Sequence, residues 1–142
     1  MILGEFRARE EGIIVTARQE QISAELGIVG LAAVAGMAIS AVDNFAFGGE
    51  ISPIAVVALL LLATACVGLG WSKWRWAAVA AVWVWLPSAH VFKHLLNLPD
   101  TLHPNTYPSI AMLAGFSLFV SLIGLGVGAL VRHAIIRADG RQ

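Results

Sequence analysis

The sequence predicts an all-α integral membrane protein, built as a bundle of four transmembrane helices. Two observations predict this class. Of the 142 residues, 58% are hydrophobic and 13% are charged, whereas soluble domains average about 45–50% apolar and about 25% charged residues. The apolar residues are also gathered into four long stretches with short polar connections between them, at residues 26–42, 54–71, 76–96 and 110–131.

Each stretch reaches or approaches the length that crosses a bilayer. A helix needs about 20 mostly apolar residues to cross a hydrocarbon core of about 30 Å. The second and fourth stretches contain no charged residue. Uncharged stretches of this length would be extreme for the core helices of a small soluble domain. We therefore expect one bundle over residues 26–131, preceded by a partly helical segment over residues 1–25 and followed by a tail over residues 132–142.

The basic residues predict how the bundle is oriented. Lys and Arg precede the first stretch, lie between the second and third, and follow the fourth, whereas the other two connections contain none. Positively charged residues favour the cytoplasmic side. The sequence therefore predicts a multi-pass protein of the cell inner (plasma) membrane, surrounded by lipids, with both termini cytoplasmic. The formal net charge of zero gives no reason to expect a nucleic-acid partner.

The segment before the first stretch contains a helix-start signal. Residues Thr16 to Gln19 have the form of a capping box, in which two side chains satisfy free backbone donors at a helix start. We expect a short cytoplasmic helical extension that begins there and continues into the first stretch. Upstream, Gly12–Val15 is a β-prone run. We expect one of three states for it: a lightly ordered tail, a strand that pairs with a partner strand, or a segment at the lipid interface.

The third stretch carries most of the polar chemistry. Pro87 predicts a kink, because proline lacks the N–H that would bond to the carbonyl of Trp83. Trp76, Trp83, Pro87, His90 and His94 fall on one helical stripe. Polar groups in a membrane helix face protein or a water-filled cavity. The stripe is therefore expected to face inward or toward a bound molecule.

His90 and His94 are the candidate cofactor-binding residues. Because they are four residues apart, both imidazoles project from one helical face, and Asp100 and His103 of the following loop complete a candidate set of metal ligands. The same histidines are candidate ligands for haem or a pigment. The alternative is structural: His90 forms hydrogen bonds within the bundle, and His94 lies at the outer interface.

Small residues predict where helices approach one another closely, either within the bundle or against another protein. The candidate packing positions are Ala32, Gly36, Gly68, Gly70, Gly124 and Gly128. Aromatic residues near the ends of the stretches are expected to act as anchors at the membrane interfaces. These are Trp71, Trp74, Trp76 and Tyr107.

The chain carries no recognisable catalytic signature. It has no nucleophile elbow, no phosphate-binding loop and no paired carboxylates within a stretch. The sequence therefore predicts a small accessory or structural subunit of a larger membrane complex rather than an enzyme, with other membrane subunits or its own copies as partners. The alternatives are a membrane protein that binds a metal, haem or pigment through the histidines of the third stretch, and a small homo-oligomeric channel or transporter.

Overall fold

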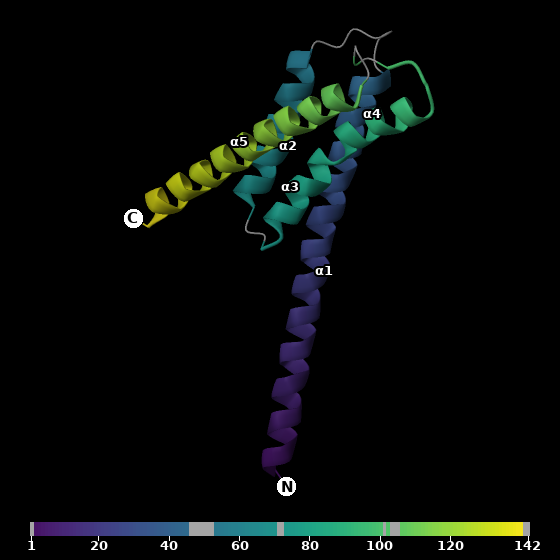
Figure 1. The fold of residues 1–142 in the computed structure, drawn as a ribbon. Helices are drawn as coiled ribbons and strands as arrows, with labels where there is room; N and C mark the ends of the chain where they lie inside the picture. Colours follow the sequence, from purple (N-terminus) through teal and green to yellow (C-terminus); the bar gives the residue numbers. More distant parts are fainter. Residues whose placement is uncertain (1, 46–52, 71–72, 101, 103–105, 141–142) are drawn as a thin grey trace.

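The computed structural model describes residues 2–45, 53–70, 73–100, 102 and 106–140, and the side chains of these residues except 2–13, 17 and 45. This part of the chain is helical and contains no strand. Figure 1 shows the helices, which are α1 (Ile2–Phe45), α2 (Pro53–Leu69), α3 (Arg75–Trp83), α4 (Trp85–Leu95) and α5 (Tyr107–Asp139).

α1 is one continuous helix of 44 residues, about 66 Å long at the usual rise per residue. The predicted helix start at Thr16 is therefore wrong, and the β-prone run Gly12–Val15 is helical. The residues around this run are mostly Glu, Arg, Ala and Gln, which are strong helix formers, and they outweigh the weak strand preference. The N-terminal half of α1 projects well beyond the other helices (Figure 1).

One stripe of the C-terminal half of α1 packs into the bundle. Ala32, Gly36 and Ile39 are buried at intervals of four and three residues, the spacing of one helical face. This stripe contacts α3 and α4. Gly36 is required there, because a Cβ on it would lie 2.8 Å from the Cα of Val82 in α3.

α2 and α5 form the most extensive helix pair. The buried residues of α2 recur every four positions, at Val56, Leu60, Thr64 and Gly68. Thr64 and Gly68 lie against Gly124 and Gly128 of α5, respectively. A Cβ on Gly124 would lie 2.7 Å from the carbonyl oxygen of Leu61, and one on Gly128 would lie 3.0 Å from the Cα of Gly68. The two backbones are therefore nearly in contact.

The predicted kink in the third stretch is confirmed, since the helix divides at Val84 into α3 and α4. Pro87 lies one turn later and is buried. The side chain of Trp83, next to this bend, forms hydrogen bonds with α5. Its Nε1–H donates to the carbonyl oxygen of Ala114 and to Oγ of Ser117, with Nε1 2.9 Å and 3.1 Å from these atoms.

Two helical segments among the described residues are long and apolar enough to cross a membrane, Ile14–Asn44 within α1 and Tyr107–Asp139. α2 is apolar but shorter, with 17 residues, and the third expected span is divided between α3 and α4. The all-helical fold is confirmed, while the bundle of four spans stays a prediction.

Candidate functional site

His90 is the centre of the candidate site. It lies on α4 on the same buried face as Leu86 and Pro87, and its side chain is 2% exposed. Of the stripe predicted to face inward, Pro87 and His90 are buried. The buried part does not extend to Trp76, which is 60% exposed and lies at the start of α3, beyond the bend.

Two carboxylates bind the two nitrogens of the His90 imidazole. Nδ1 lies 2.8 Å from Oδ1 and 3.0 Å from Oδ2 of Asp100. Nε2, on the other side of the ring, lies 3.1 Å from Oδ2 of Asp43 at the end of α1. A neutral imidazole has one N–H, whereas an imidazolium has two. The imidazolium form of His90 therefore satisfies both carboxylates at once.

Lys93 adds a second cation to this cluster. Its Nζ lies 3.7 Å from Oδ1 of Asp100, and the side chains of Lys93 and Asp100 are 15% and 2% exposed. With His90 as an imidazolium, two positive charges face the two negative charges of Asp43 and Asp100. The cluster is then electrically neutral, which lowers the cost of burying its members.

The pKa of Asp100 is lowered from its ordinary value. Burial opposes ionisation and by itself would raise this pKa, but the hydrogen bond and the positive charge of His90 outweigh it. The N–H of Leu102 and the charge of Lys93 act in the same direction as His90. Asp100 is therefore held as a carboxylate in a place where an isolated carboxyl group would favour its neutral form.

A tight turn after α4 brings Asp100 back to the helix. Asn97 has a φ of 51°, a left-handed conformation that Asn tolerates better than most residues. The N–H of Leu98 donates to the carbonyl of Lys93 at 3.0 Å, and the N–H of Asn97 donates to that of His94 at 3.3 Å. These two bonds form a Schellman motif, which reverses the chain and presents Asp100 to His90.

Of the predicted ligands, the structure brings together only His90 and Asp100. His94 instead contacts Tyr107 edge to face, with ring centroids 4.4 Å apart, and His103 lies outside the described residues. Asp43 and Asp100 bind opposite sides of the imidazole, so they do not converge on one point. Among the described residues, no group of three or more His, Cys, Asp and Glu is placed to hold a metal ion.

Asp43 is the site residue that sequence reasoning missed. In the sequence, it looks like an ordinary charged residue just after the first apolar stretch. The available signal was its register, because Asp43 follows Gly36 and Ile39 at seven and four residues, on the face of α1 that packs into the bundle. An acidic residue on a buried helical face requires a partner.

The opposite end of the bundle is held by a second set of polar contacts. The buried carboxylate of Glu25 in α1 accepts the N–H of Lys73 at 3.1 Å, and Arg132 of α5 donates to the carbonyl of Gly70 at 2.8 Å. Both contacts hold the turn between α2 and α3, so α1 and α5 fix this turn from two directions.

The predicted packing and anchor residues take different positions. Ala32, Gly36, Gly68, Gly124 and Gly128 lie at helix contacts, whereas the nearest atoms to a Cβ on Gly70 would belong to its own turn. Trp74, Trp76 and Tyr107 are 45%, 60% and 60% exposed. Trp71 lies outside the described residues.

No protein-family model, curated protein or solved structure matches this chain.

Proposed function

We propose that this protein is a small, non-catalytic accessory subunit of a larger membrane protein complex. It lies in the plasma membrane as a bundle of four spans with cytoplasmic termini, and packs against other membrane subunits. The proposal includes the shorter apolar helix α2 and the α3–α4 pair as the second and third spans.

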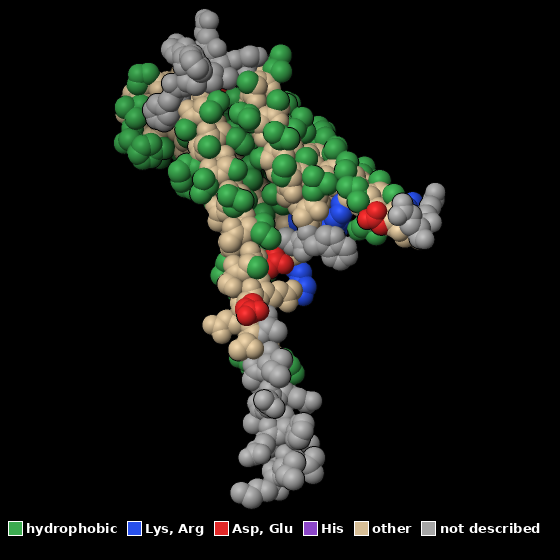
Figure 2. All heavy atoms as spheres, turned by 180° about the vertical axis from the view of Figure 1, so that it is seen from behind, with side chains coloured by type: hydrophobic (Ala, Val, Ile, Leu, Met, Phe, Trp, Pro, Cys, Tyr) green, Lys and Arg blue, Asp and Glu red, His purple; other side chains and the backbone are tan. Residues whose placement is uncertain are grey.

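The apolar surface supports a membrane location. Only 22% of the most apolar window of Ile14–Asn44 and 33% of that of Tyr107–Asp139 is buried inside the protein, whereas a core helix of a soluble protein is mostly buried. Figure 2 shows apolar side chains covering the visible face of the bundle, with charged side chains gathered toward the projecting part of α1 and the end of α5. A surface of this extent needs lipid or protein around it.

The polar contacts at the two ends of the bundle support the proposed orientation, with both termini cytoplasmic. Glu25 and Asp43 are separated by 18 residues of α1, or about 27 Å of helix, close to the thickness of a hydrocarbon core of about 30 Å. Lys73, Arg75 and Arg132 belong to the end held by Glu25. The positive-inside tendency then favours the cytoplasm on that side.

One exposed face of α5 supports the proposal of a protein partner. Gly115, Phe119, Leu122 and Gly126 recur at helical spacing and are all exposed. A Cβ on either glycine would meet nothing within 4 Å in the described part of the chain. Small residues flanking larger ones allow a second helix to approach closely in lipid. The inward glycines of α5 already serve the contact with α2, so this outward pair is available to another subunit.

The histidine site favours a structural role over cofactor binding. Both nitrogens of His90 are engaged by carboxylates, so a metal, haem or pigment bound there must displace Asp43 or Asp100. We therefore rank the cofactor-binding protein second and the homo-oligomeric channel or transporter third.

The test is to isolate the protein from its native membrane in mild detergent, identify stoichiometric partner chains by mass spectrometry, and record the absorption spectrum and metal content. Gly126→Leu should abolish co-purification of the partners without lowering the unfolding temperature, because the position is open in the described part of the chain. The matched Gly128→Leu should lower that temperature, because α2 fills the space. A chain that purifies without other subunits, or a histidine-dependent chromophore or metal, contradicts the proposal.

A further inference from the structure

The turn between α2 and α3 gathers more positive than negative charge. Lys73 is exposed and Arg75 is half-buried at the start of α3, and neither side chain forms an ion pair in the described part of the chain. Arg132 brings a third cation to the turn through its bond to the carbonyl of Gly70. The carboxylate that contacts the turn, Glu25, accepts the backbone N–H of Lys73. We call Lys73, Arg75 and Arg132 the basic turn; its three cations face one carboxylate, which leaves positive charge in excess.

Other charges on this side of the bundle do not cancel the excess. On α1, the exposed Arg18 is followed by the exposed Glu20. Near the end of α5, Arg137 is followed by Asp139, so neither pair adds net charge. The charges of residues 5–11 lie about 20 Å or more further along α1, beyond the Debye length of about 8 Å at physiological ionic strength. The excess is therefore a local property of the basic turn.

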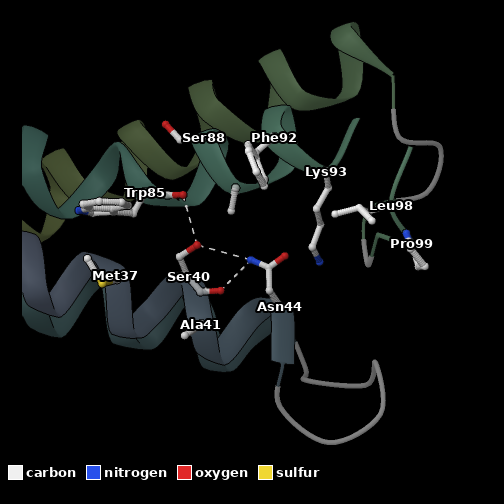
Figure 3. Close-up of a pocket in the computed structure, with 11 residues that line it drawn as sticks. Met37, Ser40, Ala41, Asn44, Trp85, Ser88, Phe92, Lys93, Leu98 and Pro99 are labelled. Carbon is white, nitrogen blue, oxygen red and sulfur yellow. Dashed lines mark hydrogen bonds between the residues drawn. The ribbon is translucent and has the colours of Figure 1, made fainter. Parts of the chain in front are cut away.

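Among the described residues, the opposite end of the bundle carries no such excess. Its polar side chains Ser40 and Asn44 are uncharged, and they donate to the backbone carbonyls of Trp85 and Ser40 at 3.2 Å and 2.7 Å (Figure 3). Lys93 lies 3.7 Å from the carboxylate of Asp100. The charge asymmetry of the bundle therefore arises at the basic turn.

Two tryptophans alternate with the cations of this turn. Trp74 and Trp76 flank Arg75 and are 45% and 60% exposed. Tryptophan concentrates at the membrane interface, where its ring lies at the level of the headgroups. In the proposed orientation, the two indoles therefore place Lys73 and Arg75 at the depth of the lipid phosphates, and their long side chains can follow a phosphate at that level.

We propose that the basic turn binds the phosphate of an anionic phospholipid in the cytoplasmic leaflet. Lys73 and Arg75 contact the phosphate, and the rings of Trp74 and Trp76 lie against the glycerol region and the upper acyl chains. This proposal rests on the membrane location and orientation in the proposed function, but not on the accessory-subunit role.

The charge of the turn and its indoles together select this ligand. The guanidinium of Arg75 can bind a phosphate through two parallel hydrogen bonds. The excess positive charge favours a lipid with a net negative charge over phosphatidylcholine, whose quaternary ammonium it repels. An acidic protein segment would be attracted by the same cations, but it would give no role to two exposed indoles beside them.

The experiment uses these indoles as reporters. The full chain is reconstituted in phosphatidylcholine nanodiscs that contain a fixed fraction of either dibrominated phosphatidylglycerol or dibrominated phosphatidylcholine, and the quenching of tryptophan fluorescence gives the relative binding constant. Each Lys or Arg near an anionic leaflet strengthens the attraction about fivefold. Wild type should therefore prefer phosphatidylglycerol about twentyfold at low salt. The preference should be largely lost in 1 M NaCl, where the Debye length is about 3 Å.

Variants locate the binding to the turn. The double variant Lys73→Gln, Arg75→Gln should lose the preference, and Lys73→Gln alone should reduce it about fivefold. The matched double variant Arg18→Gln, Arg137→Gln removes two exposed cations from the same side of the bundle and should keep the wild-type preference. Unfolding temperatures in the same nanodiscs show that each variant is folded before its quenching is compared.

Several outcomes would overturn the lipid site. One is equal quenching by the two brominated lipids in the wild type, and another is an equal loss of preference in both double variants, which would indicate a diffuse attraction. Displacement of phosphatidylglycerol by free glycerol phosphate would assign the turn to a soluble anion. Displacement by a polyglutamate peptide would assign it to an acidic protein segment.

The same assay separates this proposal from the proposed function. A chain that does not insert into nanodiscs contradicts both, because both require the membrane. A chain that inserts and shows no preference for phosphatidylglycerol contradicts only the lipid site. Loss of a partner subunit would leave the quenching unchanged, because the assay uses this chain alone.

Discussion

The carboxylate of Asp100 lies 2.8 Å from Nδ1 of His90, which precedes it by ten residues on α4. Two features produce the contact: the Schellman turn at Asn97 reverses the chain, and the imidazole offers a donor at the place where the reversed chain arrives. Asp43 holds the other nitrogen. One imidazole thus connects α1, α4 and the loop before α5.

Removing His90 should strongly destabilise the protein. His90→Ala leaves the buried carboxylate of Asp100 without its main partner, and breaking a buried ion pair in this way costs roughly 3–5 kcal/mol. His94→Ala is the matched control on the same helix, because it loses only the ring contact with Tyr107, worth about 1 kcal/mol. Denaturant unfolding of both variants in the same detergent measures the difference. Equal losses would contradict the role assigned to His90.

Asp100 should make the protein sensitive to acid. Because its pKa is lowered in the folded protein, ionised Asp100 stabilises the fold fully above the ordinary carboxyl pKa of 3.8. This stabilisation is lost as the pH falls below that value and through the lower pKa of the folded state. Unfolding temperatures measured from pH 7 to pH 2 should therefore fall steeply at the acid end.

The variants for this pH experiment are Asp100→Asn and Asp139→Asn. Asp100→Asn should be less stable at pH 7 and should show a shallower decrease in acid. Asp139 is exposed near the end of α5, so Asp139→Asn should keep the wild-type profile. An unchanged acid limb in Asp100→Asn would rule out Asp100 as its source.

The glycines of α1 should respond to the same substitution with opposite signs. Ala is favoured over Gly in a helix interior by roughly 0.5–1 kcal/mol, so Gly30→Ala, where a Cβ meets nothing within 4 Å, should raise the unfolding temperature. Gly36→Ala places its Cβ against the backbone of Val82 and should lower it, because overpacking costs about 1–3 kcal/mol. Thermal unfolding compares the two, and a gain in stability in both would contradict the close approach of α1 and α3.

The indole of Trp83 should contribute to stability through its N–H. Trp83→Phe removes the donor to Ala114 and Ser117, which should cost about 0.5–1.5 kcal/mol for the hydrogen bond and more for the lost volume. Trp76→Phe removes the same atoms from a side chain that is 60% exposed and should have little effect. Denaturant midpoints in detergent separate the two variants, and a loss in Trp76→Phe as large as in Trp83→Phe would place the contribution elsewhere.

Hydrophobic patterning was sufficient to predict the helices but not their ends. Long, uninterrupted apolar stretches predict helices, and Pro87 marks the bend because its missing N–H is a local property. The start of α1 could not be predicted in the same way. A capping box at Thr16 describes a side-chain arrangement that is favourable at a helix start, but the strong helix formers before it extend the helix to Ile2.

The site could be predicted only in part, because its partners come from distant segments. His90, His94 and Asp100 were visible as a local group of polar residues, and the structure joins only two of them. Asp43 is 47 residues from His90, and no local pattern connects them. Its pairing depends on how α1 and α4 pack together, which in turn depends on close contacts such as that of Gly36 with α3.

The length of α1 places its N-terminus far from the other helices (Figure 1). From Ile2 to Glu25 the helix continues for about 35 Å, and Glu25 is the first buried residue of α1 among those whose side chains the structure describes. A continuous helix transmits tilt and rotation along its axis, so a small turn of the segment between Glu25 and Asp43 becomes a larger sweep at the N-terminus. Force applied to that end would, in reverse, act on the contact between Asp43 and His90.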